Sequence, residues 1–157
     1  MARVLIVGCG CRGQELARAL VAQGHAVRGT TRDPARRAAI AAAGAEPVLA
    51  DPDRVGTLVA ALHGVTIVVW LLAGATGTPE QLRELHGPRL WALLEKLVDS
   101  PVRGYVHERV GEEDADLVET ASRTWSIPVA TIPSGPWPQA AMAPIDALLH
   151  SPPDQKP

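Results

Sequence analysis

The sequence lacks phenylalanine, contains one tyrosine and two cysteines, and has no apolar run long enough to cross a membrane. The longest such run, Val65 to Ala75, is far shorter than the roughly 20 residues of a membrane helix and is rich in β-branched residues, so we expect a buried strand there. Cys9 and Cys11 are too close in sequence for an unstrained disulfide bond and lack the further ligands of a zinc site. We therefore expect two reduced thiols and no metal site.

An excess of charge of either sign is also missing. The 157 residues include 20% charged side chains and carry a formal net charge of -2. Without a basic excess there is no electrostatic reason to expect nucleic acid or an anionic membrane surface as a partner. Because no charged and apolar leader precedes the run Val4 to Val7, we expect a cytoplasmic location.

Short apolar runs alternate with amphipathic or alanine-rich segments along the whole chain. The pattern predicts strands at residues 3–7, 25–30, 46–50, 65–73, 103–110 and 128–132. It predicts helices at residues 14–23, 34–43, 54–63, 79–98, 115–125 and 140–149. This alternation is typical of βαβ units, and the length fits one domain. We therefore predict a single α/β domain with a doubly wound, parallel, six-stranded sheet.

A glycine-rich loop follows the first predicted strand and opens the first predicted helix. Its sequence is Gly8-Cys9-Gly10-Cys11-Arg12-Gly13. The first glycine permits a tight turn, the second lets backbone approach a pyrophosphate, and the third lets the helix pack closely on the strand. The helix N-terminus, with Cys11 and Arg12, adds N–H donors for an anion. We interpret the loop as the binding site of a dinucleotide phosphate cofactor; a glycine-rich turn without a ligand is the alternative.

The end of the second predicted strand indicates which dinucleotide is preferred. An NAD-binding domain usually has an acidic residue there for the ribose 2′-hydroxyl, whereas this chain has Thr31 and Arg32. A hydroxyl and a guanidinium suit a 2′-phosphate, and Arg36 and Arg37 could strengthen the positive field, although both are also typical of a solvated helix face. Asp33 precedes a proline and is better interpreted as a helix cap. We expect NADP(H) to be preferred, with NAD(H) possible.

Two further segments are candidates for contacts with the same cofactor. Asp51, after the third predicted strand, would lie beside the adenine, and a helix cap is an equally good interpretation. Leu72, Ala73 and Gly74, after the fourth predicted strand, would lie against the ribose and the far side of the pyrophosphate. Small residues at this point leave room for a ligand.

The first 75 residues resemble a known family. The run from Val4 to Arg37, with Val7-Gly8-Cys9-Gly10 and the segment Gly24 to Pro34, is similar to atypical, extended-type short-chain dehydrogenases/reductases. The resemblance implies a Rossmann-type sheet of strand order 3-2-1-4-5-6, bound NADP(H) or NAD(H), and frequent loss of the usual catalytic residues. It fades beyond Gly77, so we expect an NAD(P)-binding domain at residues 1–135 without the extended type's substrate domain. Residues 136–157 would form a C-terminal helix and a frayed, proline-rich tail.

The catalytic pair of that family, a tyrosine and a lysine four residues apart on one helix, has no counterpart here. Tyr105 and Arg109 have this spacing, but they lie in a predicted strand, where positions four apart are separated by roughly 13 Å. His107 is a weak candidate for a proton donor at the end of this strand. The alternative is that Tyr105, His107 and Arg109 form one half-exposed strand face, and the catalytic residues are otherwise unknown.

Three functions fit these observations. The first is a small NADP(H)-dependent oxidoreductase whose substrate lies in a crevice between Gly10, Gly74 and His107. The second is a non-catalytic NADP(H)-binding sensor or regulatory subunit, and a domain that binds another nucleotide such as coenzyme A is a third possibility. The leucine-rich helix at residues 79–98 has more apolar surface than one sheet face needs, which predicts a homodimer.

Overall fold

Six parallel strands form the central sheet of the computed structural model, which describes residues 2–151. The strands are β1 (Arg3–Val7), β2 (Ala26–Thr31), β3 (Glu46–Leu49), β4 (Ile67–Trp70), β5 (Gly104–His107) and β6 (Val129–Thr131). Their order is β3-β2-β1-β4-β5-β6, and every neighbouring pair is parallel. The predicted fold class and strand order are therefore confirmed.

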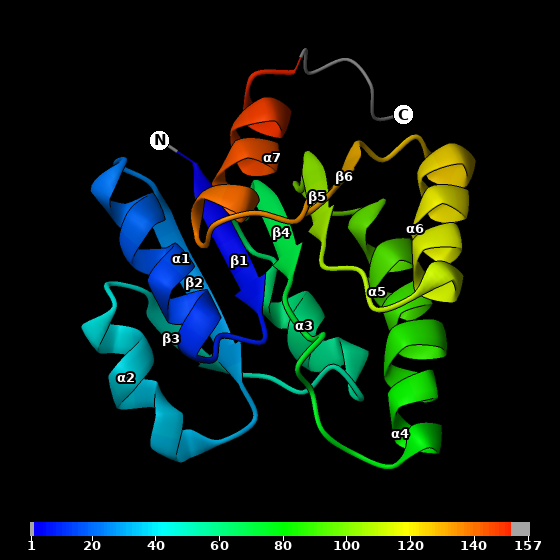
Figure 1. Cartoon of the computed structure of the whole chain (residues 1–157), viewed down its shortest axis with the longest axis horizontal. Coiled ribbons are helices and arrows are strands. Elements are labelled where there is room, and N and C mark those ends of the chain that lie inside the picture. The colour runs from blue at the N-terminus through cyan, green and yellow to red at the C-terminus, as the bar shows by residue number, and fades with distance from the viewer. Residues whose placement is uncertain (1, 152–157) are drawn as a thin grey trace.

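Helices cover both faces of this sheet (Figure 1). They are α1 (Cys11–Ala22), α2 (Arg37–Ala42), α3 (Val55–Ala61), α4 (Pro79–Glu84), α5 (Leu90–Leu97), α6 (Glu112–Trp125) and α7 (Gln139–Leu149), with a 3-10 turn η1 (Pro34–Arg36) and a π-helical turn η2 (Leu85–Arg89). Helices α1, α2 and α7 lie on one face, and α3, α5 and α6 lie on the other. None of the helices within residues 2–151 is both long and apolar enough to span a membrane.

Each face of the sheet has its own hydrophobic core because neighbouring side chains of a strand point to opposite sides. On β1, Val4 and Ile6 pack with α1, α2 and α7, whereas Leu5 and Val7 pack with α3, α5 and α6. All four side chains are fully buried. Burial on both faces explains why this strand is a continuous apolar run rather than an alternating one.

The segment predicted as one helix at residues 79–98 contains α4, η2 and α5 in succession. Pro88 lies within η2, and a proline inside a helix removes one N–H and crowds the carbonyl of the preceding turn, which a widened turn relieves. Five of the six leucines of this segment, Leu85, Leu90, Leu93, Leu94 and Leu97, are buried in the core of the single chain, and Leu82 is half-buried. Most of the apolar surface on which the homodimer prediction rested is therefore used within one chain, and the homodimer stays a prediction.

Strands β4 and β5 are shorter than the apolar runs that predicted them. Backbone hydrogen bonds from Leu71 to Val7 and from Glu108 to Trp70 continue the ladder by one residue, after which the chain turns into loops. The final described helix, α7, packs against β5, β6 and α1. The predicted frayed tail includes residues 152–157, which lie outside the described part of the chain.

Candidate functional site

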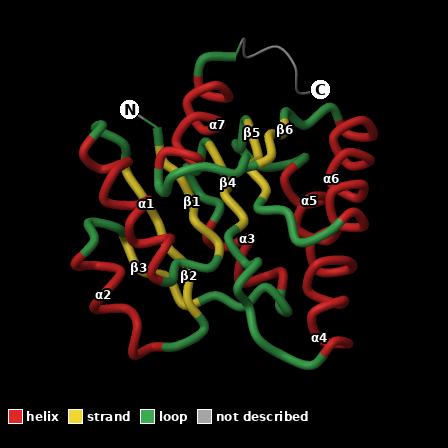
Figure 2. Tube along the Cα trace, in the orientation of Figure 1, coloured by secondary structure: helices red, strands yellow, loops and turns green. Residues whose placement is uncertain are grey.

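The loops after β1, β2, β3 and β4 follow the carboxyl ends of their strands at one edge of the sheet (Figure 2). Residues of these loops line a crevice of about 590 Å³. Its volume lies within the range of roughly 300–1,000 Å³ that is typical of small-molecule sites. The residues predicted from sequence to bind a cofactor and found in its lining are Gly8, Gly10, Cys11, Arg12, Gly13, Thr31, Arg32, Leu72 and Gly74. Asp51 and Ala73 are not part of the lining.

The glycine-rich loop has the geometry that an anion site requires. Gly8 has a φ of +89°, and a Cβ at this position would lie 2.5 Å from the carbonyl oxygen of Leu71, so only glycine fits. Gly10 is the N-cap residue of α1 and supplies no side-chain cap. The first N–H groups of α1 therefore face the crevice without an intrahelical partner, which favours a negatively charged group there.

Neighbouring strand residues hold this loop in place. The Gly8 N–H donates to Thr30 Oγ1 at 3.1 Å, and the Cys9 N–H donates to the carbonyl oxygen of Thr30 at 2.9 Å. The Cys9 side chain is 2% exposed, and burial raises the pKa of its thiol to about 11. Cys9 is thus a neutral packing residue, whereas Cys11 is exposed in the crevice lining.

Asp33 is a helix cap, as the sequence predicted. Its carboxylate accepts the Ala35 N–H at 2.9 Å at the start of η1. Thr31 Oγ1 in turn accepts the Asp33 N–H at 3.0 Å. Both polar groups are therefore used by the turn that follows β2. Asp51 has a similar local role, because its Oδ1 accepts the Asp53 N–H at 2.9 Å.

Two arginines flank the glycine-rich loop at the β2 side of the crevice. Arg32 is exposed, and its closest ionic contact is Asp53 at 3.8 Å, which is too long for a strong hydrogen bond. The Nη1 atom of Arg36 lies 3.6 Å from the position that a Cβ on Gly10 would occupy. Both arginines belong to the crevice lining, whereas Arg37 does not.

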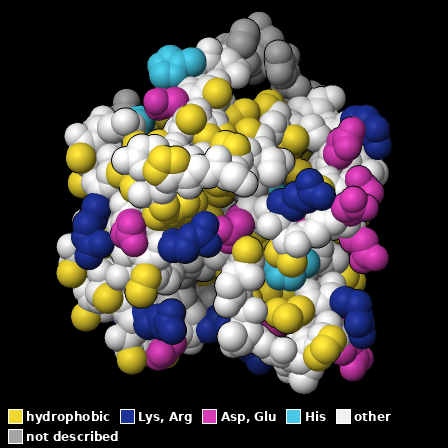
Figure 3. Space-filling view, in the orientation of Figure 1, with side chains coloured by type: hydrophobic (Ala, Val, Ile, Leu, Met, Phe, Trp, Pro, Cys, Tyr) yellow, Lys and Arg dark blue, Asp and Glu magenta, His cyan; other side chains and the backbone are white. Residues whose placement is uncertain are grey.

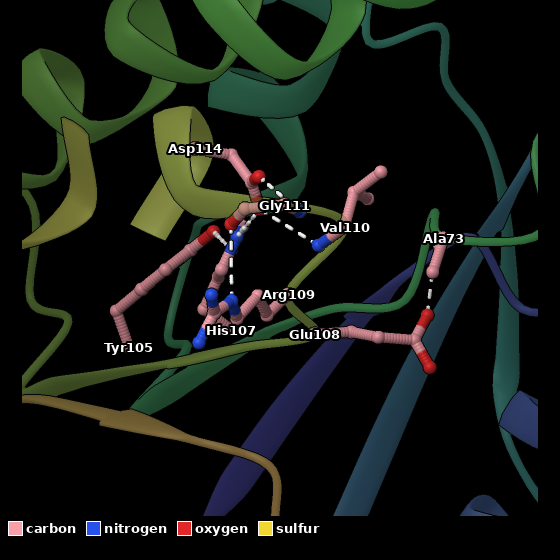
Figure 4. A network of polar contacts seen from close by, with 8 residues as sticks. All are labelled: Ala73, Tyr105, His107, Glu108, Arg109, Val110, Gly111 and Asp114. Carbon is pink, nitrogen blue, oxygen red and sulfur yellow. Dashed lines mark hydrogen bonds and ion pairs between the residues drawn. The ribbon is translucent and has the colours of Figure 1, made fainter. Parts of the chain in front are cut away.

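Tyr105, His107 and Asp114 form a buried chain of hydrogen bonds at the carboxyl end of β5 (Figure 4). The Tyr105 hydroxyl lies 2.7 Å from His107 Nδ1, and His107 Nε2 lies 2.7 Å from Asp114 Oδ2. Tyr105 and His107 are 0% and 1% exposed, so the prediction of a half-exposed strand face is wrong for both. Their side chains point into the core beneath α6 because the chain turns back at Gly111 and brings Asp114 over the strand.

The protonation states of Tyr105, His107 and Asp114 follow from the surroundings of each side chain. Burial raises the pKa of Tyr105 well above its ordinary value and lowers the pKa of His107. Burial acts to raise the pKa of Asp114, but hydrogen bonds from the Val110 N–H, His107 and the Gly111 N–H outweigh it and the pKa is lowered. A neutral His107 thus donates a hydrogen bond from Nε2 to a charged Asp114 and accepts a hydrogen bond from the Tyr105 hydroxyl at Nδ1.

His107 does not line the crevice, so the expected substrate site between Gly10, Gly74 and His107 is not formed. The residue after it, Glu108, points the other way, toward Ala73 (Figure 4). Glu108 is 7% exposed, its Oε1 accepts the Ala73 N–H at 3.0 Å, and its Oε2 lies 2.5 Å from Arg12 Nη2. The sequence indicates that Glu108, like His107 and Arg109, lies at the end of a buried parallel strand, where site residues gather. It gives no sign of the two partners of Glu108, Ala73 and Arg12, and no role was predicted for this residue.

Arg12 is held from a second side by the segment before α7. The Arg12 guanidinium carbon lies 4.2 Å from the ring centroid of Trp137, and Trp137 Nε1 donates to the Arg12 carbonyl oxygen at 2.9 Å. Two segments far apart in sequence therefore meet over the start of α1. The face that includes the carboxyl edge mixes basic, acidic and hydrophobic side chains without a patch of one sign (Figure 3).

Comparisons with known proteins agree with this geometry. A family model described as NAD(P)H-binding matches residues 8–105. A short-chain dehydrogenase/reductase superfamily protein from Agrobacterium tumefaciens, solved with bound NAD, is 19% identical with a TM-score of 0.69, covering 82% of this chain and 48% of its own. Triphenylmethane reductase of Citrobacter sp. is 15% identical with a TM-score of 0.68, and the match covers 87% of this chain and 50% of the reductase. A Bacillus cereus UDP-glucuronic acid 4-epimerase, solved with NAD, is 16% identical with a TM-score of 0.65, covering 82% and 55%.

The structural likeness extends over one part of each of these proteins. The chain spans about half of their length, since 48% to 55% of each is covered. At these identities the similarity establishes a shared fold. None of the curated proteins matches the sequence significantly.

Proposed function

Because this chain belongs to the NAD(P)H-binding family, whose model its residues 8–105 match, we propose that it is a small oxidoreductase of the atypical short-chain dehydrogenase/reductase type that prefers NADP(H). The nicotinamide dinucleotide would lie in the crevice, with its pyrophosphate over Gly10 and the first turn of α1. The residues of the glycine-rich loop fit a pyrophosphate at this position. Gly10 leaves the space open, and the first N–H groups of α1 are free to donate to phosphate oxygens.

The observation that carries the NADP(H) preference is the pair of arginines at the end of β2. Arg32 and Arg36 both line the crevice beside the glycine-rich loop. The acidic residue nearest to them in sequence, Asp33, uses its carboxylate to cap η1. A 2′-phosphate would therefore meet two guanidinium groups, whereas a 2′-hydroxyl would meet only Asp33 among the lining carboxylates, and Asp33 Oδ1 already accepts the Ala35 N–H.

The proposed activity is hydride transfer, which the nicotinamide supplies when it is bound. The protein would contribute binding and orientation of the two reactants. Among the described residues, those that line the crevice include no tyrosine, histidine or lysine. The substrate would therefore obtain or release its proton through water rather than through a tyrosine–lysine pair.

A non-catalytic NADP(H)-binding sensor is the second candidate, and the state of Tyr105 favours it. The only tyrosine of the chain is fully buried and its hydroxyl is bonded to His107. It cannot reach a substrate in the crevice. Dinucleotide occupancy would then serve to change association with a partner.

Calorimetric titration with NADPH and NADH tests the proposed cofactor site. We expect NADPH to bind more tightly than NADH, and Arg32→Ala to weaken NADPH binding by about 1.5–3 kcal/mol while leaving NADH binding unchanged. Arg37→Ala removes an exposed arginine outside the lining and is the matched control. Equal affinity for the two nucleotides would contradict the preference, and binding of neither would contradict the cofactor site itself.

The two candidate functions are separated by turnover. NADPH oxidation, followed by absorbance with a panel of aldehydes, ketones and quinones, is expected for the oxidoreductase. Tight NADPH binding with no oxidation by any of them would favour the sensor. Arg32→Ala is the test variant here as well, because genuine turnover should fall when the cofactor site is weakened, and Arg37→Ala is again the control.

A further inference from the structure

The ion pair between Arg12 and Glu108 lies at the border of the crevice: Arg12 belongs to the lining, and Glu108 does not. A doubly wound sheet binds the two halves of a dinucleotide on either side of the point where the strand order reverses, which here lies between β1 and β4. Arg32 and Arg36 belong to the β2 side, which would hold the adenosine half. Glu108 follows β5, so the ion pair lies on the side that would hold the nicotinamide half.

Arg12 is available to a ligand on this side. Its side chain is 50% exposed and the residue lines the crevice. The contacts with Glu108 and Trp137 fix its position. A guanidinium has five N–H donors, and only Nη2 is used by Glu108, so donors remain for an anionic oxygen.

Glu108 has the opposite effect on such a ligand. Its side chain is 10% exposed, and it contacts the Ala73 N–H and Arg12. A buried carboxylate adjacent to Arg12 neutralises the positive charge that an incoming anion would meet, and it repels that anion directly. Glu108 therefore binds the Arg12 guanidinium in the way that a phosphate or carboxylate of a ligand would.

We propose that Arg12 is the side chain that binds the anionic group of a ligand in the nicotinamide half of the crevice, and that Glu108 is an internal anion that competes for it. This inference deepens the proposed function and rests on it. The ligand chemistry is an anionic oxygen group, either the phosphate on the nicotinamide side of the dinucleotide or a carboxylate of the substrate. Affinity for this group is set by the balance between Arg12 and Glu108.

The proposal gives the two residues effects of opposite sign, which calorimetry can measure. Glu108→Gln keeps an oxygen that can accept the Ala73 N–H and removes the charge. We expect it to bind NADPH several-fold more tightly than the wild type, whereas Arg12→Gln should bind NADPH about tenfold less tightly. Adenosine 2′,5′-bisphosphate lacks the nicotinamide half, so its affinity should be the same in all three proteins.

Controls separate these effects from loss of folding. Arg12→Gln leaves Glu108 buried without its cation, so the double variant Arg12→Gln/Glu108→Gln, which removes both charges, is measured beside it. The double variant should melt like the wild type and should still bind NADPH less tightly. Arg18→Gln and Glu113→Gln remove exposed charges of the same two signs and should change nothing.

The two sources of the anion are distinguished by a second titration. If NADPH affinity is the same in every variant, malonate is titrated in the presence of saturating NADP⁺. Malonate binding that is tighter in Glu108→Gln and lost in Arg12→Gln supports the proposal with a substrate carboxylate as the ligand.

Three results would overturn the proposal. The first is weaker binding of both NADPH and malonate in Glu108→Gln, which would mean that Glu108 only positions Arg12. The second is that no variant changes the affinity for either ligand. The third is an equal loss of adenosine 2′,5′-bisphosphate binding in Arg12→Gln. A wild-type protein that binds neither NADPH nor the bisphosphate would instead overturn the proposed function.

Discussion

His107 Nε2 lies 2.7 Å from Asp114 Oδ2, and this hydrogen bond ties the carboxyl end of β5 to the first turn of α6. The same Asp114 carboxylate accepts the N–H groups of Val110 and Gly111 at 2.9 and 2.7 Å. Three donors therefore converge on one buried carboxylate. Such a fully satisfied network fixes the loop between strand and helix, and it depends on the protonation state of His107.

We predict that the free energy of unfolding decreases as the pH falls below about 6.5. Burial lowers the pKa of His107 in the folded chain, so the unfolded chain binds more protons between the folded pKa and about pH 6.5. The stabilisation is fully present above that pH and is lost as the pH falls through the folded pKa. Urea unfolding at several values between about pH 5 and about pH 8 measures this slope.

His107→Gln should lower the free energy of unfolding by about 1–3 kcal/mol at neutral pH, because Tyr105 and Asp114 lose a partner. It should also flatten the pH dependence. Some slope should remain, because burial lowers the pKa of His86 too. His63→Gln changes an exposed histidine and is the control. An unaltered slope in His107→Gln would contradict the assignment of the pH dependence to this residue.

Gly8 and Gly10 are predicted to differ in what an added methyl group disturbs. A Cβ on Gly8 would lie 2.5 Å from a backbone oxygen, and the φ of +89° is unfavourable for alanine. Gly8→Ala should therefore destabilise the fold by about 2 kcal/mol or more. Circular dichroism during thermal unfolding measures the loss.

Gly10→Ala should keep the fold and lose the cofactor. Its φ is -82°, and the nearest atom to an added Cβ is the movable Arg36 Nη1 at 3.6 Å. The methyl group would project into the space proposed for the pyrophosphate, so NADPH affinity should fall at least about tenfold with an unchanged melting temperature. Normal NADPH binding by Gly10→Ala would argue against this position of the pyrophosphate.

The fold could be predicted from the sequence because local signals and global topology agree. Apolar runs of strand length alternate with helical segments, and the glycine-rich loop marks the first β-to-α turn of a doubly wound sheet. The π-helical turn at Pro88 was not predicted. The predicted ends of β4 and β5 lay too far along the chain, since apolar residues such as Leu71 remain buried after regular pairing ends. Hydrophobicity reports burial, and burial extends beyond the strand.

The crevice loops were predictable for the same reason, but the long-range polar contacts were not. Arg12 and Glu108 are 96 residues apart in number (108 − 12), and their pairing depends on how β5 lies beside β4. His107 and Tyr105 alternate along the strand as an exposed face would. They are buried because Tyr105 packs in the core with residues of α5 and α6 and Asp114 of α6 contacts His107. Side-chain partners brought together by tertiary packing leave no periodic signal in the sequence.

The two cysteines are predicted to differ in reactivity toward a maleimide in the folded protein. Cys11 is exposed in the crevice lining, whereas Cys9 is 2% exposed and burial raises the pKa of its thiol to about 11. Mass spectrometry should find a single label, on Cys11, and bound NADPH should slow its addition. Cys11→Ser should remove the label. Rapid labelling of Cys9 in the native protein would contradict the described packing of the loop.

Arg28, the charged residue of β2, is predicted to stabilise the fold mainly through two backbone carbonyl groups. Its side chain is 10% exposed, and its Nη1 donates to the carbonyl oxygens of Ala61 and His63 at 2.6 and 2.9 Å, at the end of α3. Arg28→Met preserves the apolar stem but leaves these carbonyls without a donor, which should lower the free energy of unfolding by about 2–4 kcal/mol. Glu46 is the other partner of Arg28, at 3.0 Å, but its side chain is 61% exposed, so Glu46→Gln should cost less than about 1 kcal/mol. Urea unfolding of both variants measures the difference, and equal losses would mean that the ion pair, rather than the two carbonyl contacts, is what Arg28 contributes.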